Sequence, residues 1–164
     1  MVDLSMLVKL YQFNAELIEK HTAGVSHSDS LKPLATDGNS VNWLLGHIIS
    51  ARTSIFEYVS GGAVWSEDQR VRYRHGSTNV TQNGPGVMRL ETLITDFNES
   101  QRRLEAGLVE LPVDKLGQAT GYGEWTLGGR LVYLQFHETH HVGQLMSAAQ
   151  ALGCNGDWLQ DPTL

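Results

Sequence analysis

Cysteine is nearly absent from this chain of 164 residues, and long apolar runs are missing altogether. The one cysteine, Cys154, excludes an internal disulfide and a cysteine-rich zinc site. No stretch approaches the roughly 18 consecutive apolar residues that a membrane-spanning helix needs. The first residues, Met-Val-Asp-Leu-Ser, lack the charged start and apolar run of a signal peptide. We therefore expect a soluble cytoplasmic protein with no membrane partner.

Positive charge is also scarce. The 12 Lys and Arg residues stand against 18 Asp and Glu residues, which gives a net charge of -6. The basic residues are scattered, so the electrostatic footprint of a nucleic-acid-binding protein is missing. Hydrophobic residues make up 41% of the chain, enough at this length to bury a core without disulfides or structural metals. We expect a single domain over residues 1–164 and no nucleic-acid partner.

Four segments carry the apolar spacing of amphipathic helices. They cover about residues 3–20, 40–59, 87–111 and 126–152. Asn39 and Ser40 are competent N-caps for the second helix, and Gly61 and Gly62 are expected to stop it. Residues 61–85 then form a connection of weak periodicity, longer than the roughly 12–15 residues that loops in compact domains rarely exceed. Such a connection suits a bundle whose second and third helices run parallel, so we predict an all-α four-helix bundle.

The run His-Glu-Thr-His-His at residues 137–141 lies in the last predicted helix. Its outer histidines, His137 and His141, are four residues apart and therefore share one helix face, about one turn from each other. On a helical wheel His141 falls within the apolar stripe, and His137 borders it together with Gln144. Two imidazoles at this spacing can bind one metal ion, but such a site needs a further ligand from another helix.

His47 is the best candidate for the third ligand, because it lies within the apolar stripe of the second helix. A single histidine on such a face is usually a hydrogen-bonded core residue. Together with the pair, however, it predicts a metal site made of His47, His137 and His141. Three neutral imidazoles leave the charge of the ion intact and coordination positions open, which suits zinc, nickel or iron(II) and Lewis-acid chemistry.

The same five residues match the zinc-protease signature His-Glu-x-x-His. In those enzymes a glutamate or a histidine downstream supplies the third ligand. This chain has no glutamate after Glu138 and no histidine after His141, and Asp157 falls in a predicted tail. The sequence therefore does not favour a protease.

Two residues next to the histidines have open roles. Glu138 is about 100° around the helix from His137, so it is either an orienting partner or base, or a solvated or interface carboxylate. Gln144 lies one turn beyond His141 and either hydrogen-bonds to a ligand or bound water, or is a surface glutamine.

Other residues also permit two interpretations. Trp43, Tyr122 and Trp125 either wall a pocket over the metal or close one end of the bundle. Arg52, one turn past Ile48, either holds an anionic substrate or is a surface charge. The remaining histidines, His21, His27 and His75, fall at the end of the first helix, beyond it, or in the long connection.

The segments Asn-Trp-Leu-Leu-Gly-His at 42–47 and Phe-His-Glu-Thr-His-His-Val-Gly-Gln-Leu at 136–145 resemble the DinB/YfiT superfamily of four-helix bundles. The resemblance covers essentially the whole chain. It implies an up-down-down-up bundle, a divalent metal held by His47, His137 and His141, and often a homodimer. Characterised relatives include transferases and isomerases that use mycothiol, bacillithiol or glutathione, and many others have no known reaction.

Three hypotheses follow. The first is a metal-dependent enzyme, either a thiol-dependent S-transferase or one of hydrolase type, acting on a small molecule such as a low-molecular-weight thiol. The second is a non-catalytic bundle that binds a metal or a small molecule. The third is a metal-free bundle with core histidines.

Overall fold

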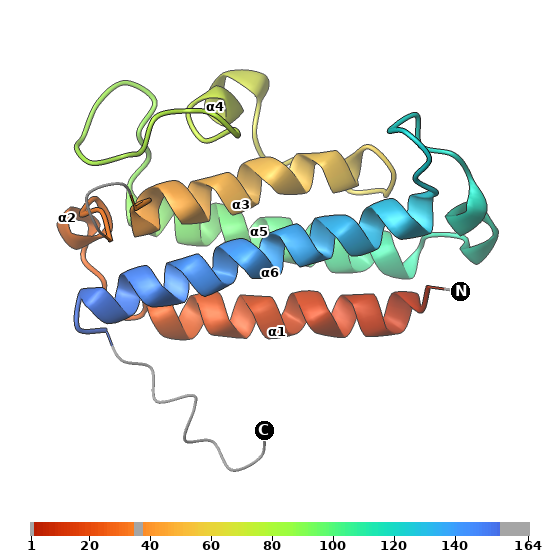
Figure 1. The fold of residues 1–164 in the computed structure, drawn as a ribbon, viewed down its shortest axis with the longest axis horizontal. Helices are drawn as coiled ribbons and strands as arrows, with labels where there is room; N and C mark the ends of the chain where they lie inside the picture. The colour runs from red at the N-terminus through yellow and green to blue at the C-terminus, as the bar shows by residue number, and fades with distance from the viewer. Residues whose placement is uncertain (1, 35–37, 155–164) are drawn as a thin grey trace, which may run out of the picture.

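The computed structural model describes residues 2–34 and 38–154, and four long helices dominate it (Figure 1). These are α1 (Leu4–Thr22), α3 (Val41–Phe56), α5 (Leu90–Val109) and α6 (Leu127–Ala151). Three short pieces join them: α2 (His27–Ser30), α4 (Glu67–Val71) and the 3-10 helix η1 (Val113–Gly117). In the described ranges, the only β-structure is two isolated bridges, and no strand is formed. The all-α prediction is therefore confirmed. They also contain no helix that is both long and apolar enough to cross a membrane.

The two helices that carry the candidate ligands begin at side-chain caps. The Ser40 hydroxyl accepts a hydrogen bond from the Trp43 backbone N–H at 3.2 Å. The Thr126 hydroxyl accepts one from the Gly129 N–H at 3.3 Å. Each cap satisfies one of the N–H groups that the first turn of a helix leaves without an internal partner. Of the two N-caps expected for α3, Ser40 performs the role.

The end of α3 differs from its predicted boundary by three residues, as does the start of α5. The apolar pattern runs on to Val59, but the helix ends at Phe56. The chain then crosses α5 where Gly107 leaves room for it, since a Cβ at Gly107 would clash with the backbone carbonyl of Ser60. Val59 is still buried, which is why it matched the helical pattern.

Each long helix packs mainly against two others: α1 and α3 both contact α5 and α6. The apolar side chains between them form two clusters. One contains Leu44 of α3 and Leu145 of α6, and the other contains Leu104 of α5 and Leu131 of α6.

A layer of buried polar side chains separates the two clusters, and every long helix contributes to it. Its members are Asn14 from α1, Arg52 from α3, Ser100 and Gln101 from α5, and Glu138 from α6. We call this set the polar layer.

Arg52 is the centre of the polar layer. Its Nε and Nη2 donate to the two Glu138 oxygens at 2.8 and 2.9 Å, in a fork-to-fork ion pair. Its Nη1 donates to the Ser100 hydroxyl at 2.9 Å, and Nη2 also donates to the Gln101 amide oxygen at 2.6 Å. Asn14 adds a hydrogen bond to Glu138 at 3.3 Å. Burial of both charges is tolerable because partners surround them.

The sequence interpretation of Arg52 as a surface charge or substrate anchor was wrong, and so was that of Glu138 as a solvated carboxylate. Their side chains are 1% and 3% exposed. The helical wheel predicted that His141 lies within the buried face of the last helix, and this was not accurate. In the structure that face runs through Leu134, Glu138 and Val142, and His141 lies at its edge.

The connection between α3 and α5, residues 57–89, folds back onto α3. Trp65, Tyr73 and Val80 are buried in the same cluster as Leu44. In Figure 1 the segment around α4 lies on the far side of α3 from α1. It thus forms a wall next to α3 that the sequence pattern did not reveal.

Candidate metal centre

Three histidines from two packed helices converge at the α3–α6 contact. His47 lies on α3, and His137 and His141 lie one turn apart on α6. One nitrogen from each ring can be chosen so that all three atoms lie within 4.8 Å of one another. The structure therefore brings together the three side chains that the sequence singled out.

The His47 ring is held with one nitrogen engaged and the other unpartnered. Its Nδ1 lies 2.8 Å from the backbone carbonyl of Tyr73, and a carbonyl only accepts, so Nδ1 carries the proton and donates it. Its Nε2 is buried and has no hydrogen-bond partner among the described residues. A buried, unpartnered lone pair is costly unless something binds it, and an engaged Nδ1–H is the usual way to orient a metal-ligating imidazole.

His141 repeats this arrangement on α6. Its Nδ1 donates to the side-chain oxygen of Gln144 at 2.8 Å, three residues along the same helix. Its Nε2 lies 3.2 Å from Nε2 of His137. With Nδ1 protonated, the His141 Nε2 presents a lone pair to the neighbouring ring.

The donor set fits a divalent ion. Two nitrogens that each bind one ion at about 2.1 Å, at a tetrahedral angle, lie about 3.4 Å apart. The 3.2 Å between the Nε2 atoms of His137 and His141 is close to that value. Without a cation, Nε2 of His137 can donate its proton to Nε2 of His141, and a bound cation would replace this hydrogen bond.

Burial keeps the three imidazoles neutral. Desolvation lowers the pKa of His47 to about 4. The hydrogen bond to the Tyr73 carbonyl raises this pKa, but by less than desolvation lowers it. Desolvation likewise lowers the pKa of His141 to about 4, with Gln144 opposing, and it lowers the pKa of His137. Near pH 7 all three rings are in the form that binds metals.

Two neighbours on α3 fix the surroundings of His47. Trp43 stacks on its ring, with centroids 4.7 Å apart and planes 6° from parallel. Gly46 lies directly under the Tyr73 ring. The Tyr73 hydroxyl in turn donates to Asn42 at 3.1 Å, so the residue that orients His47 is anchored at both ends.

Gly46→Ala should destabilise the protein by about 1–3 kcal/mol, the usual cost of overpacking. The new methyl group would occupy the space of the Tyr73 ring. Urea unfolding measures the loss. The matched control is Gly143→Ala in the middle of α6, where a Cβ meets nothing within 4 Å and better helix propensity should stabilise slightly. Equal unfolding midpoints for Gly46→Ala and the parent would contradict the close packing of Tyr73.

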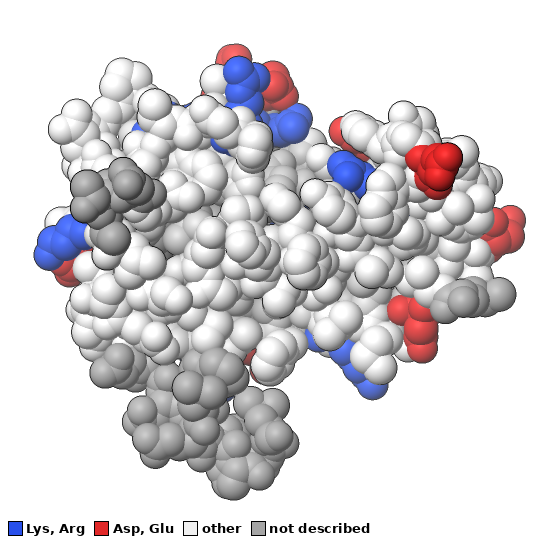
Figure 2. Space-filling view, viewed as in Figure 1, with Lys and Arg blue, Asp and Glu red and all other residues white. Residues whose placement is uncertain are grey.

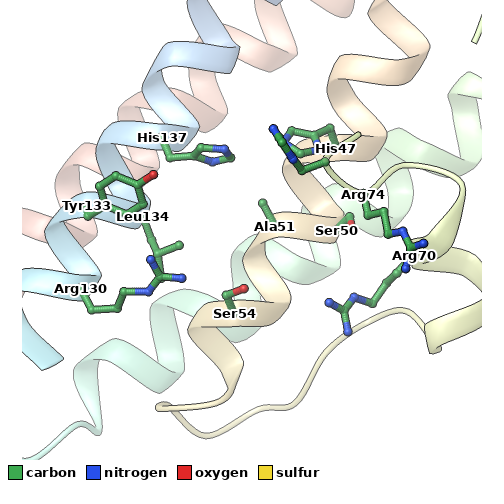
Figure 3. Close-up of a pocket in the computed structure, with 11 residues that line it drawn as sticks. His47, Ser50, Ala51, Ser54, Arg70, Arg74, Arg130, Tyr133, Leu134 and His137 are labelled. Atoms are coloured by element: carbon green, nitrogen blue, oxygen red, sulfur yellow. The ribbon is translucent and has the colours of Figure 1, made fainter. Parts of the chain in front are cut away.

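A cavity of about 420 Å³ opens beside His47 and His137 (Figure 3). Helix α3 contributes Ser50, Ala51 and Ser54 to its lining. The other lining residues come from α6 and from the long connection: Arg70, Arg74, His75, Arg130, Tyr133 and Leu134. Two of the three histidines, His47 and His137, are thus accessible from a lined cavity.

Sequence reasoning missed most of this lining. Arg130 and Tyr133 precede His137 by seven and four residues, so helical spacing alone could have found them. Arg70, Arg74 and His75 lie in the long connection, where no periodicity exists to place them.

Of the three aromatic residues that the sequence suggested for the pocket, one lies beside the histidines and two do not. Trp43 contacts His47 and also approaches His141, with ring centroids 6.4 Å apart. Tyr122 and Trp125 are each 47% exposed and do not line the cavity, so they do not wall it.

The remaining candidates lie apart from the three histidines. His21 is buried near the end of α1, and His27 hydrogen-bonds to Asn83 at 2.8 Å. The Glu138 oxygens bond to Arg52 and Asn14, and in the described residues neither oxygen bonds to a histidine. Asp157 lies outside the described residues.

Comparison with known proteins gives one result. No curated protein and no solved structure gives a significant match. A family model described as the DinB superfamily matches residues 10–145, a stretch that contains His47, His137 and His141. Because this match covers most of the chain, the protein belongs to the DinB superfamily.

Proposed function

We propose that His47, His137 and His141 bind one divalent metal ion and that the protein is a metal-dependent enzyme. The observation that carries this is the convergence of three ring nitrogens within 4.8 Å, with Nε2 of His47 buried and unpartnered. A bound ion would supply Lewis acidity and lower the pKa of a water or thiol that reaches it. Three protein ligands beside an open cavity are typical of catalytic rather than structural sites.

Zinc and nickel are the preferred ions in this proposal, with iron(II) next, because imidazole suits all three. The preferred reaction is transfer involving a small thiol, and hydrolysis ranks second. The sole cysteine, Cys154, does not line the cavity, so a thiol would have to come from a bound small molecule. Elemental analysis of protein purified without a His-tag, followed by thiol-transfer assays, tests both parts. Absence of metal would contradict the first part.

A non-catalytic bundle that binds metal or a small molecule is the second candidate. It is favoured by the absence of a described carboxylate in the cavity lining, where a general base would be expected. A protein that holds one equivalent of zinc but turns over no thiol or ester substrate would support it.

We also propose that residues 1–164 form one domain with up-down-down-up helix order. The long connection between α3 and α5 supports this, because it is long enough to return the chain along the bundle.

A homodimer completes the proposal. Large apolar side chains are exposed on two adjacent helices: Met6, Leu10 and Phe13 on α1, and Val132 and Phe136 on α6. Figure 2 shows few charged side chains over the middle of this view. Sedimentation should give twice the 18.1 kDa of one chain, and Phe136→Asp should give the monomer. A monomeric parent would contradict the dimer.

The metal-free protein should lose stability as the pH falls from about 6.5 towards 4. The folded-state pKa values of His47 and His141 are about 4, below the ordinary 6.5, so folding favours their neutral forms. Below pH 6.5 these histidines take up protons in the unfolded protein before they do so in the folded protein. The free energy of unfolding is therefore highest above pH 6.5 and falls as the pH approaches the folded-state pKa values near 4. Urea midpoints of chelator-treated protein at pH 7 and pH 5 measure the loss.

The control for this experiment is His141→Gln, which removes one of the two groups. Its midpoint should fall less between the two pH values. His47, His137 and His21, whose pKa values burial also lowers, remain in both proteins and leave a residual slope. An unchanged slope in His141→Gln would contradict the assignment.

A further inference from the structure

The cavity beside the histidines concentrates positive charge in an acidic protein. The chain has a net charge of -6, yet the cavity lining includes Arg70, Arg74 and Arg130 and, among the described residues, no Asp or Glu. The three neutral histidines add no negative charge to balance them. A divalent ion at the histidines would increase the positive charge of the cavity further.

The arginines come from two different walls. Arg130 lies on α6, two turns before His137, whereas Arg70 lies on α4 and Arg74 just beyond it. In Figure 3, Arg130 and Arg70 reach towards the cavity from opposite sides, with Ser54 of α3 between them. Figure 2 likewise shows Lys or Arg side chains near α4 and near the start of α6, on either side of a hollow.

The charges of these arginines are largely uncompensated. Nε of Arg70 and Nε of Arg130 are buried without hydrogen-bond partners in the described part of the chain. The Arg130 guanidinium lies over the rings of Tyr122 and Tyr133, 4.5 and 5.4 Å from their centroids. These contacts position the guanidinium but leave its N–H groups free for a ligand.

One carboxylate does approach. Nη1 of Arg70 pairs with Glu67 at 2.9 Å, but Glu67 is 67% exposed and three residues away on the same short helix. Exposed pairs of this kind are weak and screened by salt, so a better-placed anion can displace Glu67. Arg74 makes no ion pair with any described residue.

We infer that this cavity binds a small organic dianion, whose carboxylate or phosphate groups contact Arg70, Arg74 and Arg130 while its other end faces His47 and His137. The inference rests on the proposed function, since it names the substrate class of the same site. Guanidinium forks match carboxylate and phosphate oxygens in pairs. The volume of about 420 Å³ is that of a small-molecule pocket.

Calorimetric titration with succinate and with its neutral dimethyl ester tests the inference, on both zinc-loaded and chelator-treated protein. We expect saturable binding of succinate and none of the ester. Arg70→Gln and Arg130→Gln should each weaken succinate about tenfold, as expected for the loss of one charged hydrogen-bonding partner. Phenyl phosphate, titrated in parallel, distinguishes a phosphate ligand from a carboxylate one by its tighter binding.

Arg102→Gln is the matched control, since it removes the same charge from an exposed site on α5. It should leave succinate binding unchanged. Arg130→Lys keeps the charge and should retain part of the affinity, which separates loss of charge from loss of fold. The inference is overturned if neither dianion binds, or if Arg70→Gln and Arg130→Gln bind them as tightly as the parent.

The two proposals can fail separately. A parent that binds succinate but no zinc would contradict the metal site and support the dianion. A parent that binds zinc but neither dianion would overturn the dianion alone.

Discussion

Replacing His137 with alanine should reduce the zinc content of the purified protein from about one equivalent to less than about a tenth of it. His137 supplies one of the three converging nitrogens. Loss of even an outer partner of a metal ligand costs about 10–100-fold in affinity, so loss of a ligand should cost at least about 100-fold. His137 is preferable to His47 for this test, because His47 is 3% exposed and its truncation would also open a cavity in the core.

The matched control is His140→Ala. His140 is exposed on the same helix and its ring lies 5.1 Å from that of His141, but it is not part of the converging group. Zinc measured by elemental analysis, and by competition with a chromophoric chelator, should be unchanged. The metal site is refuted if His137→Ala retains its zinc, or if His140→Ala loses as much.

Glu138→Gln should destabilise the fold by about 3 kcal/mol, the lower end of the cost of breaking a buried ion pair. The substitution keeps the shape of the side chain but removes its charge, so the Arg52 guanidinium is left buried without a counter-charge. Urea unfolding of metal-free protein measures the effect apart from any contribution of a bound ion.

Two comparisons isolate this effect. Glu99→Gln removes a carboxylate that pairs with Arg102 and Arg103 at the surface, and its midpoint should barely move. The double variant Arg52→Met/Glu138→Leu should recover much of the loss, because an apolar pair of similar volume leaves no buried charge. A Glu138→Gln protein as stable as its parent would show that the ion pair contributes little.

The three histidines could be found from the sequence because the information is local. Helical periodicity places His137 and His141 on one face of α6, and His47 on an apolar face of α3. Packing of α3 on α6 then brings them together. The helix positions followed from the same periodicity, apart from ends such as that of α3, which a contact with Gly107 decides.

Pairings between distant segments could not be found in this way. Arg52 and Glu138 are 86 residues apart, and the local sequence pattern of neither helix predicts their contact. The Tyr73 carbonyl is a second case, because backbone atoms in an aperiodic connection carry no sequence signal.

The walls of the cavity have different structural origins, and this makes the protein modular. The proposed ligands belong to helices whose positions the polar layer and the core hold, whereas Arg70, Arg74 and His75 belong to a connection outside the four long helices. Substitutions of these three residues can change the size and charge of the entrance while the bundle stays intact. Tyr73 limits this freedom, because its carbonyl holds His47. A segment exchanged for another should therefore redirect selectivity, provided that it keeps the buried Trp65, Tyr73 and Val80 and returns a carbonyl to the same place.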